Sequence, residues 1–399
     1  MNTSLLLSCI TLLAAAGHMK MPAQQDSTGR VVLQEEIYNR PFVVSTGSSL
    51  SVGGYVEGNT NYFATDGVSE GFSMELRRFN VFFYSSISRS ITFLSELEFE
   101  HGTEEIALET AQLDFEIDPA LVLRGGILLV PIGGYNQNHD SPKWDFIERP
   151  LVSTEIIPST LSQVGFGLYG KVPVGPAVLT YDGYIMNGLD DGIILNDAGR
   201  TYLQAGKSSE AFEEDNNGEP AYAGKLALSH MDFGEIGFSY FGGAYNRFRV
   251  EGEQVDESRW LSIYAVDISA TIGKAELHGE IAMNTITVPN DLAEMFGTRQ
   301  WGAYAEIVHP VLTISLPGSD EGVLSAGLRL EHVDYNAGSF ESTGENIGDH
   351  VSAVALGLSF RPNPATVVRA NYRRHWITDI LGNAPVHHGG VQVGIASYF

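Results

Sequence analysis

The sequence predicts an all-β protein, a single 16-stranded antiparallel transmembrane β-barrel with an inward-folded third outer loop. Segments in which apolar and polar residues alternate follow one another to the last residue, with almost no helical period. The connections between these segments alternate between short and long, a pattern typical of barrels that span an outer membrane. The longest interruption in the first half, residues 131–159, cannot be read as a strand, and a connection of that length indicates function.

The composition excludes several other classes of protein. The 399 residues include no internal apolar run of the roughly 18 residues that a spanning helix needs. A formal net charge of -26 repels phosphates and argues against a nucleic-acid partner. The single cysteine, Cys9, lies in an N-terminal apolar block, so we expect the mature chain to have no disulfide and no thiolate metal site.

The same apolar block, Leu5–Ala16, predicts a Sec-type signal peptide over residues 1–16, with cleavage as late as residue 23. Residues 24–48 are polar and are predicted to form a periplasmic lead-in, and residues 49–399 to form the barrel. This organisation predicts export to the outer membrane of a Gram-negative bacterium.

Each strand is predicted from alternation bounded by turn residues, such as Asp118-Pro119 and the run from Pro173 to Pro176. In chain order the predicted strands span residues 50–63, 74–86, 91–101, 106–117, 121–130, 161–172, 177–186, 221–230, 235–245, 259–272, 275–287, 300–316, 323–334, 351–360, 366–376 and 390–399. This order places residues 131–159 at the third outer position, where we expect the chain to fold inward and narrow the barrel.

The last strand carries a second sign of an outer-membrane barrel. Val391, Val393, Ile395 and Phe399 lie on one face, and an aromatic residue ends the chain. We expect the barrel assembly machinery to bind this strand through Phe399, and the apolar face to contact outer-membrane lipid. A soluble sandwich or propeller is the alternative; the signal peptide, the strand lengths and the terminal Phe favour the barrel.

Charged residues on the face opposite the apolar one are predicted to line a pore. They are Glu96, Glu98, Glu100, Asp114, Glu116, Arg124, Lys274, Glu276, His278, Glu280, Arg329, Glu331, Arg369 and Arg373. Acidic residues outnumber basic ones, which predicts a general or mildly cation-preferring pore. The alternative for each charge is that it solvates the wall or pairs with a cross-strand neighbour.

The residues predicted to form the constriction are His139, Asp140, Lys143, Asp145, Glu148 and Arg149. Gly165, Gly167 and Gly170 match a dinucleotide fingerprint, but they fall within a strand, and we expect them to leave room for the inward loop. No G-x-S-x-G occurs, and no Ser/His/Asp set can be placed. His375, His387 and His388 lack a defined spacing to a carboxylate. The sequence therefore predicts no catalytic residue, no cofactor and no metal site.

Between Met74 and Gly170 the sequence contains RRFNVFFYSSIS, LRGGILLVPIG, NHDSPKWDFIERPLVSTEIIPST and GFGLYG. These stretches resemble the family of phosphate-selective porins O and P, and more closely its broad set of relatives in other Gram-negative lineages. The resemblance implies a sixteen-stranded outer-membrane channel, often a homotrimer, in which the strand at 121–130 leads into the constriction loop.

Matched residue by residue, Arg124 corresponds to a lumenal arginine of this family. Pro131 and Gly133 match the strand exit, and the loop motif is matched by His139, Pro142, Glu148, Arg149 and Pro150. Ile127 and Leu129 stand where the phosphate-selective members have a polar and a basic residue, and Leu161 stands where relatives commonly place Trp. The first difference argues against selectivity for phosphate.

The sequence thus predicts an outer-membrane porin that lets small polar solutes or ions diffuse passively. Two alternatives remain. One is an anion- or phosphate-selective channel, and the other is a plugged barrel that acts as a surface adhesin or enzyme.

Overall fold

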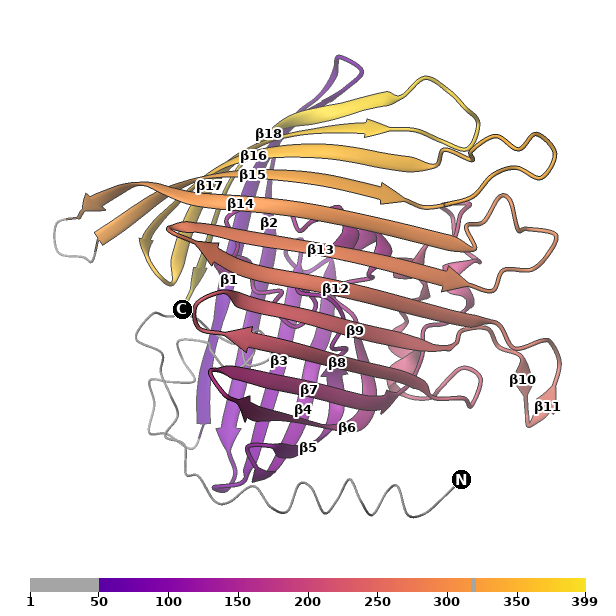
Figure 1. Cartoon of the computed structure of the whole chain (residues 1–399), viewed down its shortest axis with the longest axis horizontal. Helices are drawn as coiled ribbons and strands as arrows, with labels where there is room; N and C mark the ends of the chain where they lie inside the picture. The colour runs from indigo at the N-terminus through magenta and orange to yellow at the C-terminus, as the bar shows by residue number, and fades with distance from the viewer. Residues whose placement is uncertain (1–49, 317–320) are drawn as a thin grey trace. The chain divides into compact units, whose positions relative to one another are not determined.

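The computed structural model describes residues 50–316 and 321–399, which form one closed barrel of sixteen antiparallel strands (Figure 1). Each wall strand pairs with its neighbours in chain order, and the last strand pairs with the first to close the barrel. This confirms the predicted fold class. The predicted signal peptide and lead-in lie outside the described residues. Within those residues, no helix has the length and apolar character needed to cross a membrane.

The first eight strands of the wall are β1 (Leu50–Thr65), β2 (Val68–Ser86), β3 (Ile91–Glu100), β4 (Glu105–Asp118), β5 (Leu121–Leu129), β6 (Ser162–Val174), β7 (Ala177–Met186) and β8 (Ala221–His230). The second eight are β9 (Gly234–Ala244), β12 (Trp260–Ile272), β13 (Ala275–Ile286), β14 (Arg299–Ser315), β15 (Glu321–Asp334), β16 (His350–Asn363), β17 (Thr366–Ile377) and β18 (Val386–Tyr398). A small hairpin, β10 (Arg249–Val250) and β11 (Glu253–Gln254), extends from the connection after β9. Short helical turns lie in two long connections: η2 (Ser141–Lys143), η3 (Val152–Ile156), η4 (Asp191–Ile193), η5 (Leu203–Gly206) and η6 (Ser209–Phe212).

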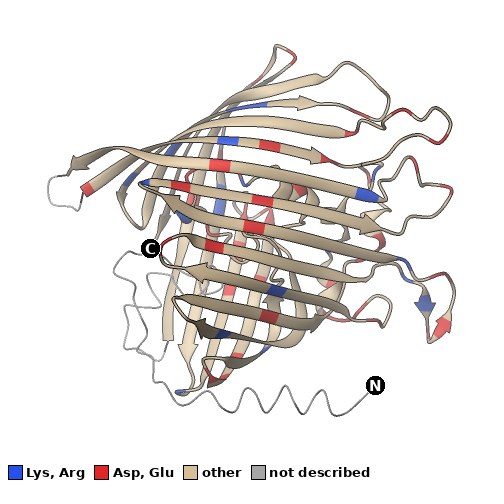
Figure 2. Ribbon diagram, in the orientation of Figure 1, with Lys and Arg blue, Asp and Glu red and all other residues tan. Residues whose placement is uncertain are grey.

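Burial alternates along the strands as the sequence pattern predicts. In β12, the apolar side chains of Tyr264, Val266 and Ile268 are exposed on the outside, whereas Asp267 between them is buried. Leu113 and Ile395 are likewise exposed. Charged residues lie part-way along many strands as well as in the connections (Figure 2). An apolar outer face and a polar inner face are the arrangement expected of a barrel in lipid.

The terminal residue takes part in barrel closure. The backbone N–H of Phe399 donates to the carbonyl of Gly54 at 3.0 Å, and its ring stacks on Phe79 with centroids 5.7 Å apart. A Cβ on Gly54 would lie 2.0 Å from the carbonyl oxygen of Asn80 and 2.7 Å from the Phe399 ring, so only glycine fits there. Phe399 and Gly54 thus extend the seam beyond the β1–β18 ladder, which runs from Tyr55 paired with Tyr398 to Thr65 paired with His388.

The connections do not alternate between short and long as strictly as predicted. At the end of the barrel that carries the long connections, β1 and β2 are joined by Asp66-Gly67 alone, and β3 and β4 by residues 101–104. Asp66 and Gly67 both have positive φ, at 49° and 85°, which suits a two-residue hairpin that continues the strand twist. For this reason β2 begins at Val68 and not at the predicted residue 74. The third connection at this end, residues 130–161, is long, as predicted.

Candidate functional site

Residues 130–161, which join β5 to β6, are here called the connecting segment. Its two ends meet at one side chain: the Asn136 amide donates to the carbonyls of Val130 and Leu161 at 2.7 and 2.8 Å, and its Oδ1 accepts from the Leu161 N–H at 2.7 Å. Pro142 is the second residue of η2, in the first turn, where its missing N–H removes no hydrogen bond within the helix. The segment therefore starts and ends at the same point beside the wall.

Arginines on three neighbouring strands bind backbone carbonyls of the connecting segment. They are Arg329 on β15, Arg361 on β16 and Arg369 on β17. Arg329 donates to the carbonyl of Glu148 at 2.7 Å, Arg361 to those of Pro142, Lys143 and Trp144 at 2.7 to 3.0 Å, and Arg369 to those of Ser141 and Phe146 at 3.1 and 2.9 Å. Their carboxylate partners are Glu306, Asp145 and Glu57, at 2.6, 3.3 and 2.9 Å respectively. Two predicted pore-lining arginines, Arg329 and Arg369, are thus buried and bound to the segment.

Predicted pore carboxylates bind the segment too. Glu331 accepts the backbone N–H of Leu151 at 2.6 Å, and Glu280 accepts the Ser153 hydroxyl at 3.1 Å. Together with the arginines, these contacts join the segment to side chains of four strands, β13 and β15 to β17.

Glycines on β14, β15 and β16 make room for apolar side chains of the segment. A Cβ on Gly327 or Gly357 would come within 2.9 Å of the Phe146 ring, and one on Gly302 within 3.0 Å of Ile156. The predicted glycines at 165, 167 and 170 serve another purpose: a Cβ there would strike residues of the neighbouring strands or turn, namely Met186, Tyr184 and Ala120. The expectation that they make room for the loop was therefore wrong.

The first half of the segment contacts β3 and β18. His139 Nε2 lies 3.2 Å from Glu96 Oε1, and the Tyr398 hydroxyl donates to Asp140 Oδ2 at 2.6 Å. Lys143 Nζ lies 3.6 Å from the same Asp140 oxygen. Glu96, His139 and Asp140 are all buried.

Other predicted wall charges pair with each other or lie near strand ends. Arg124 binds both oxygens of Asp114 at 2.7 and 2.8 Å, and Tyr169 donates to the same carboxylate. This pair is buried. Four further predicted residues lie elsewhere: Glu116 is exposed, Lys274 occupies the turn between β12 and β13, and His278 and Glu276 are 3.9 Å apart near the same turn.

Glu148 lies at the centre of a second set of contacts. Arg77 on β2 donates to both of its oxygens at 2.5 and 2.6 Å, Gln392 donates at 2.9 Å, and Arg373 lies 3.6 Å away. Burial opposes ionisation of Glu148, but Arg77 and Arg373 outweigh it and hold the pKa of this carboxyl well below its usual range. Glu148 is therefore ionised at neutral pH.

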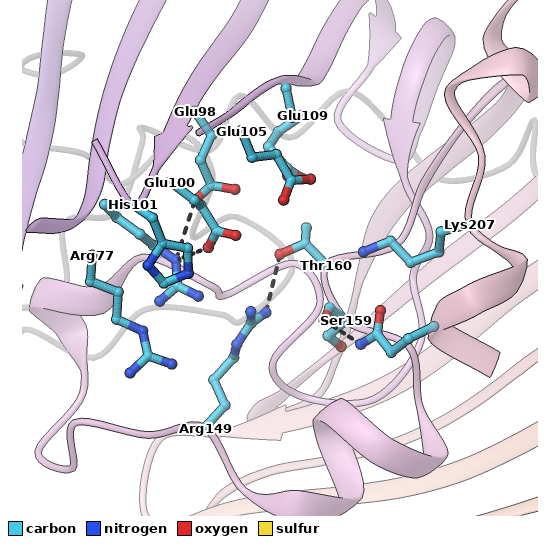
Figure 3. Close-up of a pocket in the computed structure, with 13 residues that line it drawn as sticks. Arg77, Glu98, Glu100, His101, Glu105, Glu109, Arg149, Ser159, Thr160 and Lys207 are labelled. Atoms are coloured by element: carbon cyan, nitrogen blue, oxygen red, sulfur yellow. Dashed lines mark hydrogen bonds and ion pairs between the residues drawn. The ribbon is translucent and has the colours of Figure 1, made fainter. Parts of the chain in front are cut away.

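A polar cavity of about 400 Å³ lies beside this ion pair (Figure 3). Its acidic side consists of Glu98, Glu100, Glu105 and Glu109 on β3 and β4, and its basic residues are Arg77, Arg78, Arg149 and Lys207. In Figure 3 the side chains of Arg149 and Lys207 point into the cavity toward the carboxylates. Arg149 comes from the connecting segment and Lys207 from the long connection after β7.

Arg149 and Lys207 have no carboxylate within ion-pair distance among the residues that the structure describes. The Arg149 guanidinium donates to the Thr160 hydroxyl at 3.1 Å and lies over the Trp144 ring at 5.8 Å. Burial, together with Arg78, lowers the pKa of Arg149 to about 10, so it stays protonated at neutral pH. Burial also lowers the pKa of Lys207.

A second cavity of about 250 Å³ shares Arg77 and Arg149 with the first. It is also lined by Arg373, Glu148 and Glu155. Burial raises the pKa of Glu155. Because the two cavities share these two arginines, Arg77 and Arg149 lie between them.

The alternation of the sequence did not predict that Arg77 and Glu109 line the cavity, because each lies at a β-bulge. The register of β1 against β2 shifts between Glu57 and Gly58, opposite Arg77, and that of β3 against β4 shifts opposite Glu109. An extra residue in one strand turns adjacent side chains to the same face. Arg77 and Arg78 therefore both reach the cavity. Lys207 and Gln204 lie in a connection for which strand parity gives no signal.

Comparisons with known proteins give the context of this site. No protein-family model matches the chain. A protein of Aquifex aeolicus (strain VF5), described as uncharacterized, is 26% identical over 360 residues, which cover 84% of this chain and 77% of the relative.

Several solved structures are similar. The anion-selective porin from Comamonas acidovorans has a TM-score of 0.55 at 13% identity, over 88% of this chain and 99% of that one. Salmonella typhi OmpF in complex with daunomycin has a TM-score of 0.55 at 10% identity, over 88% and 98%. The trimer form of OmpT from Vibrio cholerae has a TM-score of 0.51 at 12% identity, over 88% and 100%. The chain therefore has the barrel fold of outer-membrane porins.

Proposed function

We propose that the protein is an outer-membrane porin through which small hydrophilic solutes and ions diffuse passively. The observation that carries the proposal is the pair of polar cavities that meet at Arg77 and Arg149 inside a closed barrel with an apolar outer face. In this proposal the connecting segment is the constriction loop, folded inward from the third outer position. Its contacts with inward-facing residues on β13 and β15 to β17 support that placement.

The charges of the two cavities support a general pore with a mild preference for cations. The basic residues are Arg77, Arg78, Arg149, Lys207 and Arg373, and the acidic ones are Glu98, Glu100, Glu105, Glu109, Glu148 and Glu155. Five basic against six acidic residues is a near balance, and a strongly selective pore needs a ring or ladder of one sign. The arginines of β15 to β17, which could have formed a basic ladder, bind the segment instead. A phosphate-selective pore is therefore the weaker proposal.

Planar-bilayer recording of the purified, folded chain tests this function. In a KCl gradient we expect discrete channels and a reversal potential slightly toward the value for potassium. A strong preference for chloride or phosphate would contradict the proposed selectivity, and the absence of any conductance would contradict the porin itself.

A plugged barrel acting as an adhesin or enzyme is a second candidate, because an apolar cluster occupies part of the space between the wall and the connections. Ile156 and Val152 of the segment and Leu203 of the next long connection belong to this cluster and are fully buried. Failure to conduct, combined with a correctly folded barrel, would favour this candidate.

We further propose a homotrimer that is inserted through recognition of the C-terminal strand. The OmpT structure is described as a trimer form, and Phe399 lies exposed at the seam. Native mass spectrometry in detergent tests the oligomeric state. Deletion of Phe399 tests assembly and should reduce the amount of protein recovered in the outer membrane.

A further inference from the structure

The first half of the connecting segment brings together three potential metal ligands from two parts of the chain. Glu96 on β3 and His139 and Asp140 on the segment are all buried, and one ligand atom from each lies within 4.8 Å of the others. One imidazole nitrogen with two carboxylate oxygens is a donor set that suits Zn²⁺ and similar divalent transition metals.

The orientation of the His139 ring indicates which nitrogen is available. Nδ1 lies 3.1 Å from the backbone carbonyl of Asn136, which can only accept a hydrogen bond, so Nδ1 carries the proton. In the neutral ring Nε2 then has a lone pair, and it points at Glu96 Oε1, 3.2 Å away. Two acceptors facing each other need a positive charge between them. Metal-binding histidines commonly donate their other N–H to a carbonyl in this way.

The distance between these two atoms also fits a shared ion. Two ligands at about 2.0–2.1 Å from a tetrahedral zinc lie about 3.3 Å apart, close to the observed 3.2 Å between Nε2 and Oε1.

A second, independent observation is a buried hydroxyl with no partner next to the cluster. Tyr55 on β1 is completely buried, and its hydroxyl has no hydrogen-bond partner among the described residues. Its ring packs against Tyr398, the donor to Asp140, and its hydroxyl lies in the field of Glu98, Arg78, Glu96 and Asp140. A water bound to a metal would supply the partner that this hydroxyl lacks.

Both carboxylates of the cluster are buried and already accept hydrogen bonds from the wall. Asn80 donates to Glu96 Oε1 at 2.7 Å, and the Tyr398 hydroxyl donates to Asp140 Oδ2 at 2.6 Å. Burial of a carboxylate is costly without a compensating positive charge, and a divalent ion in this site would lie beside both carboxylates.

We propose that Glu96, His139 and Asp140 form a binding site for one divalent transition metal of the zinc type, which joins the connecting segment to β3. The site does not depend on what the barrel transports. It would fix residues 139 and 140 of the segment to β3, directly before Ser141 and Pro142, which the arginines of β17 and β16 bind.

Metal binding to the full-length, folded protein in detergent tests the proposal. After treatment with a chelator, the protein is titrated with Zn²⁺ by calorimetry, and its content is measured by elemental mass spectrometry. We expect one Zn²⁺ per chain, and affinity reduced by more than about 100-fold in His139→Gln and in Glu96→Gln, because loss of a ligand costs more than loss of its hydrogen-bond partner. His230→Gln, which alters a histidine 3.9 Å from Asp232 near the β8–β9 turn, should bind like the wild type.

A spectroscopic measurement covers the case in which a variant fails to fold. Co²⁺ added to the wild-type protein should give visible absorption bands of low-coordinate Co²⁺ with nitrogen and oxygen ligands, and Zn²⁺ should abolish them. If the wild type binds no stoichiometric Zn²⁺, or His139→Gln binds it as tightly as the wild type, the proposal is overturned, and a protonated His139 paired with Glu96 is the correct description. Either result leaves the conductance test unaffected.

Discussion

Substitution of Arg369 by Met examines how the connecting segment is anchored. The Arg369 side chain is completely buried on β17. It pairs with Glu57 at 2.9 Å and donates to the carbonyls of Ser141 and Phe146 and to the Ser141 hydroxyl at 2.9 to 3.1 Å. Methionine can fill much of the same space but can make none of these bonds.

The expected cost follows from the groups that lose their partner. Breaking one side of a buried ion pair typically costs about 3–5 kcal/mol, because the remaining charge is left uncompensated. Glu57 retains Arg78 at 3.2 Å, which reduces that penalty. The two carbonyls of the segment also lose a charged donor. We therefore expect Arg369→Met to lower the free energy of unfolding by about 3 kcal/mol, at the low end of this range.

Guanidinium unfolding in lipid vesicles, followed by tryptophan fluorescence, measures this change, and Trp144 serves as a reporter within the segment. Arg249→Met is the matched control, since Arg249 makes an exposed ion pair with Glu219 at 3.3 Å. Such a pair contributes about 0–1 kcal/mol. If Arg369→Met unfolds at the same guanidinium concentration as this control, the segment is not anchored through the arginines of the wall. Single-channel recording of the same variant should show larger fluctuations in current.

Three further predictions concern the same region. Gly327→Val should destabilise the barrel by about 1–3 kcal/mol in the same unfolding assay, because the new side chain overlaps the Phe146 ring. Gly183→Ala should leave the stability unchanged, because a Cβ added at Gly183 meets no atom within 4 Å. Glu148→Gln should lower stability at pH 7 by about 1.5–3 kcal/mol and remove part of its dependence on pH. Arg149→Gln should shift the reversal potential in a KCl gradient further toward cation selectivity, because it removes a positive charge that lines both cavities.

The direction of the pH effect at Glu148 follows from its lowered pKa. The folded protein binds fewer protons at this site than the unfolded chain, whose glutamates have a pKa of about 4.3. The stabilisation is therefore complete above that value and is lost as the pH falls toward the lower pKa of the folded state. Equal pH dependence of unfolding in the wild type and Glu148→Gln would contradict this. An unchanged reversal potential in Arg149→Gln would show that the conduction path avoids the two cavities.

Sequence reasoning succeeded where a simple period governs the structure. A wall with one apolar and one polar face requires alternation with a period of two residues, and this period predicted all sixteen strands. It also correctly predicted that Leu113 and Ile395 lie on the outer face. It failed at the bulges, where Arg77 and Glu109 break the alternation. The alternation also does not indicate whether a charged side chain on the polar face contacts solvent or another protein group. Arg369 is fully buried and bound to Glu57 and to the connecting segment, whereas Arg149 points into a cavity.

The role of Arg369 depends on a segment more than two hundred residues away in sequence, and no local signal reports such a contact. The glycines that admit Phe146 illustrate the same limit. Gly327 and Gly357 lie on strands where any small residue would satisfy the alternation. The Phe146 ring, joined at Gly357 by the Asn371 side chain, leaves no room for a Cβ at either position.

The hydrogen bonds from Asn136 to both ends of the connecting segment have a consequence for how this protein can be altered. Since residues 130 and 161 are already neighbours, and β5 and β6 pair directly from Val122 with Tyr169 to Leu129 with Ser162, a short turn could replace everything between them without lengthening any path. Excision would remove the carbonyl oxygens that Arg329 and Arg369 now bind, but their carboxylate partners Glu306 and Glu57 would remain at 2.6 and 2.9 Å. The sixteen strands close by pairing with one another, so a trimmed barrel of this kind should still close, with these guanidinium groups open to solvent.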